Sequence, residues 1–169
     1  RKTKAQTAKE NGLEPLSVLL LAQHEVDVRQ EAEKFITENV KDADTALQGA
    51  RDIIAETINE DAEIRAKLRK LFEDTATLQC KVLEDKKEEA AKYKDYFDFS
   101  EPIHKIPSHR ILAVLRGFLE GFLRMNISPE EEDALYDIEQ KYITGSLNSS
   151  VEQVKKAIKD SYKRLLQPR

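Results

Sequence analysis

The segment KYKDYFDFSEPIHKIPSHRILAVLRG, from Lys92 to Gly117, gives the clearest guide to the fold. It opens with a cluster of four aromatic residues, Tyr93, Tyr96, Phe97 and Phe99. This cluster is dense enough to anchor the packing of separate helices. Pro102 and Pro107 then enclose a short segment, and an apolar run follows. We predict that the aromatic cluster joins the preceding helices to a helix that begins at Ser108, its N-cap, and runs to about Arg116.

Two amphipathic helices are predicted upstream of this segment. The first has one apolar stripe at helical spacing, formed by Leu47, Ala50, Ile54 and Ile58, with Asp44 as its N-cap. After a break at residues 59–60, Asp61 caps a second helix, whose apolar side chains are Ile64, Leu68, Leu71 and Phe72. An ion pair from Asp61 to Arg65 is expected on its surface.

Further helices are predicted toward both ends of the chain. Glu14-Pro15 starts one near the N-terminus, and a second covers residues 29–38 with Ile36 buried. Ser128, Pro129 and Glu131 have the order of a helix start. The last helix starts at Ser149 or Ser150 and is stopped by Pro168.

Two short segments alternate with a period of two, which is typical of strands. Residues 77–82, which include Cys80, and residues 122–127 are therefore predicted to pair as a two-stranded antiparallel ribbon packed on the helices. The predicted fold is mainly α: an irregular multi-helix domain with this ribbon, in which residues 1–169 form a single domain. The chain begins with Arg and not Met, so we expect a fragment of a larger protein.

The amino-acid composition limits the classes of function that this chain can have. Charged residues make up 36% of the 169 residues and the net charge is -4, so no overall basic field favours nucleic acid. A single cysteine cannot form an internal disulfide, which suits a reducing compartment. No apolar run approaches the roughly 20 residues of a membrane span, so we expect no membrane partner.

No set of residues forms a complete catalytic or cofactor site. Ser108 and His109 are adjacent but lack an acidic partner, so a cap explains Ser108 better than a nucleophile does. His104, His109 and Cys80 lack the close spacing of zinc ligands. We therefore expect no metal, no cofactor and no enzyme activity.

Three blocks of the sequence resemble one protein family, the bacterial Tex-like transcription accessory proteins. They are RKTKAQTAKENGLEPL (residues 1–16), GARDIIAETINEDAEIRAKLR (49–69), and DYFDFSEP followed by IPSHRILAVLRG (95–117). The motif residues that carry the resemblance in the third block are Tyr96, Phe97, Glu101, Pro102, Pro107, Ser108, His109, Arg110, Arg116 and Gly117. The chain departs from the family at Phe118 and Leu119, where members carry polar residues.

The resemblance implies a part of the helical N-terminal region of a long, multidomain, cytoplasmic protein. Such proteins combine it with a nuclease-like fold, a helix-hairpin-helix unit and an S1-type RNA-binding domain, whose motifs do not occur in these 169 residues. The implied function is a non-catalytic scaffold of a nucleic-acid-binding transcription accessory protein. The implied partners are other domains of the same polypeptide, RNA or DNA, and the transcription machinery.

Two basic segments are candidates for contact with nucleic acid. Their lysines are Lys2 and Lys4 near the N-terminus and Lys155, Lys159 and Lys163 on one side of the last predicted helix. For the second group a solubilising helix face is the favoured explanation, and the acidic tract at residues 130–139 opposes binding. Weak or no nucleic-acid binding is therefore expected, and the alternative is a protein-interaction module without any nucleic-acid contact.

Overall fold

The computed structural model describes residues 2–167, so the predicted stop at Pro168 and the basic Arg1 lie outside the described residues. The chain divides into two units, of which unit 1 takes in residues 1–67 and 134–169 and unit 2 takes in residues 68–133. The single domain expected over residues 1–169 stays a prediction. The mainly helical fold with a small antiparallel sheet is confirmed.

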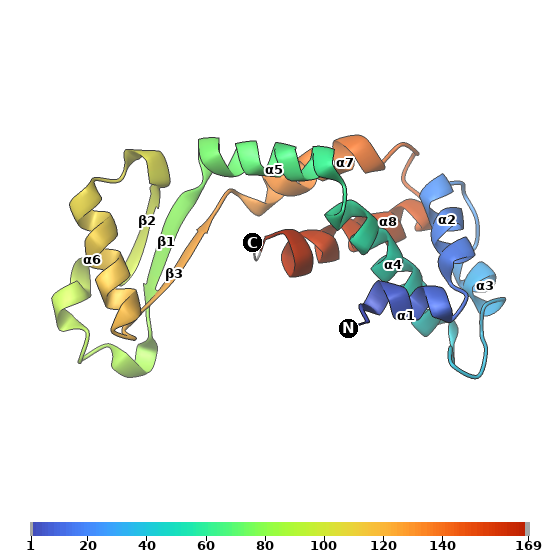
Figure 1. The fold of residues 1–169 in the computed structure, drawn as a ribbon, viewed down its shortest axis with the longest axis horizontal. Helices are drawn as coiled ribbons and strands as arrows, with labels where there is room; N and C mark the ends of the chain where they lie inside the picture. The colour runs from blue at the N-terminus through green and yellow to red at the C-terminus, as the bar shows by residue number, and fades with distance from the viewer. Residues whose placement is uncertain (1, 168–169) are drawn as a thin grey trace. The chain divides into compact units, whose positions relative to one another are not determined.

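Unit 1 is built around one long helix, α4, which contacts α1, α2, α3 and α8 (Figure 1). Helices α5 and α7 cross the boundary between the two units in sequence. These two are α5 (Ala62–Thr75) and α7 (Glu131–Tyr142). The helices that lie wholly in unit 1 are α1 (Lys4–Glu10), α2 (Glu14–Ala22), α3 (Val28–Glu33), α4 (Ala43–Asn59), α8 (Ser149–Asp160) and the π-helix η4 (Ser161–Leu166).

The apolar stripe of α4 is buried as predicted, and Ala50, Ile54 and Ile58 have no exposed surface. The predicted N-cap is wrong: the cap is Asp42, whose Oδ1 accepts the backbone N–H of Thr45 at 2.7 Å. Asp44 lies two residues later, inside the helix, where its carboxylate pairs with Arg29 at 2.8 Å.

Asp61 caps α5 as predicted, because its Oδ1 accepts the backbone N–H groups of Glu63 and Ile64. Its Oδ2 accepts the Tyr142 hydroxyl at 2.5 Å and pairs with Lys141 at 2.7 Å. The expected ion pair to Arg65 is not formed, since that guanidinium donates to Asn59. Burial raises the pKa of Asp61, but bonds from Lys141 and Tyr142 outweigh it and lower the pKa to about 2.

The capping carboxylate should make unit 1 sensitive to acid. A depressed pKa stabilises the fold above the unfolded value of about 3.9, and this contribution is lost as pH falls toward 2. Urea unfolding between pH 5 and pH 2, followed by far-UV circular dichroism, should therefore show a smaller acid dependence for Asp61→Asn than for the parent. Glu38→Gln, at an exposed position, serves as the control. Parallel curves for Asp61→Asn and the parent would contradict this assignment.

Unit 2 contains a three-stranded antiparallel sheet in the order β2-β1-β3. The predicted ribbon of β1 (Thr77–Val82) and β3 (Leu123–Ser128) is confirmed, and β2 (Asp98–Pro102) adds a third strand that the sequence did not reveal. Cys80 lies on β1 as predicted, opposite Phe99 on one side and Met125 on the other. The remaining elements are α6 (Ser108–Leu119) and the short 3-10 helices η1 (Glu84–Lys86), η2 (Ala91–Tyr96) and η3 (Ile103–Lys105).

Helix α6 runs along the sheet (Figure 1) and packs on β3 and η2. Its first residue is Ser108, but the predicted capping role is wrong. The N-cap position is Pro107, in an extended conformation, and no side chain makes a capping bond. Ser108 is therefore already helical and exposed, so its hydroxyl is not in the place of a cap.

Two other helix boundaries differ from the predictions. Helix α3 ends at Glu33, because Thr37 and Val40 form a backbone-bonded turn, and Ile36 is 43% exposed instead of buried. Helix α7 begins at Glu131, so Ser128 belongs to β3 and does not cap that helix.

Candidate functional site

The basic side of α8 is the strongest of the predicted nucleic-acid contacts. Asn148 caps this helix, and Val151, Val154 and Ile158 bury its apolar side. Lys155 and Lys159 are exposed, and neither forms an ion pair with another described residue. They are four residues apart, so they lie one turn from each other on the same face.

The two basic residues that follow α8, Lys163 and Arg164, do not continue the face formed by Lys155 and Lys159. Lys163 is exposed but belongs to the π-helix η4, whose wider turn changes the angle between successive side chains. Arg164 is held by acidic groups, at 2.8 Å from Asp160 and 3.8 Å from Asp52. The hydrogen bond to Asp160 raises the pKa of Arg164. This guanidinium is therefore engaged by acidic groups of unit 1.

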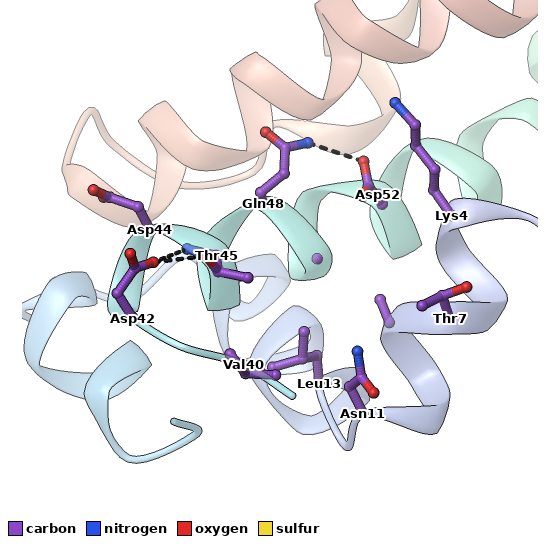
Figure 2. A pocket seen from close by; sticks show the side chains of 12 residues that line it. Lys4, Thr7, Asn11, Leu13, Val40, Asp42, Asp44, Thr45, Gln48 and Asp52 are labelled. Atoms are coloured by element: carbon purple, nitrogen blue, oxygen red, sulfur yellow. Dashed lines mark hydrogen bonds between the residues drawn. The ribbon is translucent and has the colours of Figure 1, made fainter. Parts of the chain in front are cut away.

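The two N-terminal lysines lie among acidic residues. Lys2 pairs with Glu10 at 2.8 Å. Lys4 lines an open pocket of about 380 Å³ between α1 and α4. Figure 2 shows Lys4 and Thr7 on the α1 side of this pocket and Gln48 and Asp52 on the α4 side.

The same pocket contains three carboxylates, from Asp42, Asp44 and Asp52. Gln48 donates to Asp52 at 2.9 Å, and hydrogen bonds from Thr45 lower the pKa of Asp42, which favours its charged form. Asp44 is paired with Arg29, but Asp42 and Asp52 still give this pocket more acidic than basic groups, which is unfavourable for a phosphate. The pocket therefore gives Lys4 no surface suited to a nucleic-acid backbone.

The aromatic motif packs the core of unit 2. Tyr93, 5% exposed, belongs to the buried cluster with Leu78, Cys80 and Val114, and Phe97 packs against that cluster only partly buried. Tyr96 meets the edge of the Phe99 ring at a centroid distance of 5.4 Å. The motif therefore holds α6 and η2 against the sheet, within one unit.

The other motif residues surround α6. Arg110 pairs with Glu101 of β2 at 3.1 Å, which links the helix to the edge of the sheet. Pro102 ends β2 opposite Thr77, and Pro107 stands at the helix start. Gly117 is buried inside α6, where a Cβ atom would collide with Leu123, so it permits close packing. The helix continues past the end predicted near Arg116 and reaches Leu119. His109 and Arg116 are exposed.

The described residues contain no group of three His, Cys, Asp or Glu side chains that could hold a metal ion. Burial raises the pKa of the Cys80 thiol to about 11, so the thiol is protonated near neutral pH. No helix among residues 2–167 has the length and apolar character needed to cross a membrane.

Two buried polar arrangements were not predicted. Gln23, 5% exposed at the end of α2, bonds to the segment that joins α7 and α8. Tyr93 donates its hydroxyl to Glu120 at 2.5 Å, and this bond lowers the pKa of Glu120. In both cases the partners are far apart in sequence, so no local pattern could have indicated them.

Comparison with known proteins gives a consistent result. A protein-family model described as Tex central region-like matches residues 23–164. The chain is 43% identical over 142 residues to the transcriptional accessory protein Tex of Neisseria gonorrhoeae, which covers 84% of the chain and 19% of that protein. It is 40% identical over 134 residues to protein tex of Bordetella pertussis and to protein YhgF of Escherichia coli, covering 78% of the chain and 17% of each.

The chain therefore spans less than a fifth of the length of these relatives. The name of the matching family model refers to a central region, whereas the resemblance of the sequence implied the helical N-terminal part.

Proposed function

Because the chain belongs to the Tex family, we propose that it is a non-catalytic helical scaffold within a transcription accessory protein. In this proposal it holds neighbouring domains of the same polypeptide and by itself binds nucleic acid weakly or not at all. The cytoplasm and the transcription machinery are the proposed setting; the name of the Neisseria gonorrhoeae relative, transcriptional accessory protein, supports the second of these.

One observation carries this proposal: the candidate cations do not form one basic surface. Lys2 is paired with Glu10, and Lys4 lines a pocket that also contains three carboxylates. The exposed lysines that remain on α8 are Lys155, Lys156 and Lys159. Specific nucleic-acid binding draws on several phosphate contacts together with base contacts. Three lysines on one helix of a chain with net charge -4 support only weak, salt-sensitive attraction.

Nucleic-acid binding should be measured by fluorescence anisotropy with single-stranded RNA and duplex DNA at about 0.15 M salt. We expect dissociation constants that are micromolar or weaker and independent of sequence. Lys155→Glu, Lys159→Glu and Lys163→Glu together should remove this binding with the helix content unchanged. The double variant without Lys163 should give the same loss.

A matched control distinguishes the effect of the α8 face on binding from the effect of the overall charge. Lys41→Glu, Lys87→Glu and Lys94→Glu change three exposed lysines elsewhere and alter the net charge equally. This control should retain the weak binding. Nanomolar, sequence-selective binding by the parent chain would instead overturn the scaffold proposal.

The alternative function is a protein-interaction module without nucleic-acid contact. The specific observation in its favour is the exposure of apolar side chains on α6, where Leu119 is 79% exposed. Apolar side chains gathered on a surface are typical of contacts with other proteins.

A further inference from the structure

Exposed apolar side chains are concentrated on one helix of unit 2. Of the eight large apolar side chains that are exposed in residues 2–167, three lie on α6, with exposed fractions of 62% for Leu112, 45% for Phe118 and 79% for Leu119. The other five are distributed over other elements, as isolated apolar side chains on a protein surface usually are. The outer side of α6 is therefore the unusual surface.

The apolar residues of this outer side form a stripe. Val114 and Gly117 face the sheet and are buried, whereas Leu112, Leu115 and Leu119 follow one another at three and four residues. With 3.6 residues per turn, this spacing places the three leucines on one face. It is also the spacing of the contact positions a and d in a coiled coil. We name Leu112, Leu115 and Leu119 the leucine stripe.

Most of the charged residues next to the leucine stripe are basic. From Ser108 to Leu119 the helix carries the basic residues His109, Arg110 and Arg116 and no acidic residue. The acidic residue that follows, Glu120, accepts the Tyr93 hydroxyl at 2.5 Å and pairs with Lys92 at 3.2 Å. Arg110 is paired with Glu101, but Arg116 is exposed and forms no ion pair within the described chain. Arg116 lies four residues after Leu112 and three before Leu119, so it borders the stripe.

We propose that the leucine stripe binds an acidic amphipathic helix of a partner protein. Apolar side chains of that helix would cover the leucines, and acidic side chains beside them would face Arg116. A second copy of α6 would bring its own Arg116 to the same border, and its acidic Glu120 is already engaged by Tyr93 and Lys92, so charge favours an acidic partner over a second copy. The inference rests on the proposed scaffold function, because it names the kind of partner that the scaffold holds.

The probe is a synthetic peptide of four heptads with leucine at a and d and glutamate at e and g. The glutamates disfavour pairing of the peptide with itself at neutral pH. A control peptide carries lysine in place of every glutamate. Both are labelled with fluorescein and titrated with the 169-residue chain in an anisotropy measurement.

Three variants test the surface. Leu112→Ser and Leu119→Ser change exposed side chains, so the fold should be retained, and each should weaken binding of the acidic peptide at least tenfold. Leu147→Ser, which is 71% exposed in unit 1, should leave binding unchanged. Arg116→Glu should weaken the acidic peptide and strengthen the lysine peptide, because the attraction is reversed. Circular dichroism checks that each variant is folded.

The outcomes separate this inference from the proposed function. Loss of binding in both leucine variants but not in Leu147→Ser supports it. Absent binding, or equal binding by all variants, overturns it even when nucleic-acid binding is weak as proposed. Self-association that is lost in Leu112→Ser, without peptide binding, identifies a second copy as the occupant and also overturns it. Tight nucleic-acid binding overturns the scaffold function, whatever the peptide does.

Discussion

Replacing Tyr93 by alanine should destabilise unit 2 by about 3–5 kcal/mol, the range for removal of a buried aromatic ring. The side chain is 5% exposed and its ring lies 6.1 Å from that of Phe122. A cavity would open between α6 and the sheet, and Glu120 would lose its hydrogen bond from the hydroxyl. Phe97 is only half-buried, so Phe97→Ala should destabilise unit 2 less than Tyr93→Ala does.

The single cysteine supplies the measurement for this prediction. Cys80 is 1% exposed in the same buried cluster as Tyr93, so its thiol reacts with a reagent such as DTNB only when unit 2 opens. Tyr93→Ala should accelerate the reaction by at least a hundredfold, and Tyr93→Phe, which keeps the ring, by much less. Tyr136→Ala, 61% exposed in unit 1, should have no effect. An unchanged rate in Tyr93→Ala would show that this ring does not stabilise unit 2.

Gln23→Ala should destabilise unit 1 by at least about 2 kcal/mol, because buried backbone groups would lose their partners. The Gln23 side chain donates to the carbonyl of Tyr142 at 2.6 Å and accepts from the N–H groups of Thr144 and Gly145 at 2.9 and 3.0 Å. Asn148 also donates to the backbone carbonyl of Gln23. This residue therefore fixes the segment between α7 and α8 to the end of α2.

The backbone of Gln23 allows a second comparison. Its φ of 59° lies in the left-handed region, where a side chain is unfavourable by roughly 1–2 kcal/mol relative to glycine. Gln23→Gly should therefore be less destabilising than Gln23→Ala, although both lose the same side-chain bonds. Urea unfolding followed by circular dichroism measures both, with the exposed Gln140→Ala as control. Stability of Gln23→Ala within about 0.5 kcal/mol of the parent would contradict this role.

The parts of the fold that depend on local periodicity were predictable. Helix α4 repeats its apolar residues at helical spacing, and β1 and β3 alternate strictly, so each pattern predicts its own element. Strand β2 has the sequence DFSEP, in which Asp, Ser, Glu and Pro disfavour strands, so its pairing with β1 depends on tertiary context. Two predicted caps were wrong for local reasons. At α4 the nearby Asp42 takes the cap position in place of Asp44, and at α6 the helix begins after Pro107 without a side-chain cap.

For the candidate surfaces, the sequence predicted which side chains share a helix face, but not which groups from other elements lie beside them. The sequence placed Lys155 and Lys159 on one helix face correctly, because four residues make one turn. It could not show that Lys4 lies beside Asp52, because packing of α1 on α4 brings them together. The leucine stripe was overlooked since an apolar run in a helix normally indicates core, and only the structure shows which side of α6 is covered.

The order of residues in unit 1 has a consequence for biosynthesis. Helix α8 packs on α2 and α4 but follows α4 by roughly ninety residues, all of unit 2 among them. At about 5–20 residues per second, a ribosome needs on the order of 5–20 s to add that stretch. During this time the nascent chain presents the apolar sides of α2 and α4 without their final cover, while unit 2, continuous in sequence, can complete its own core first.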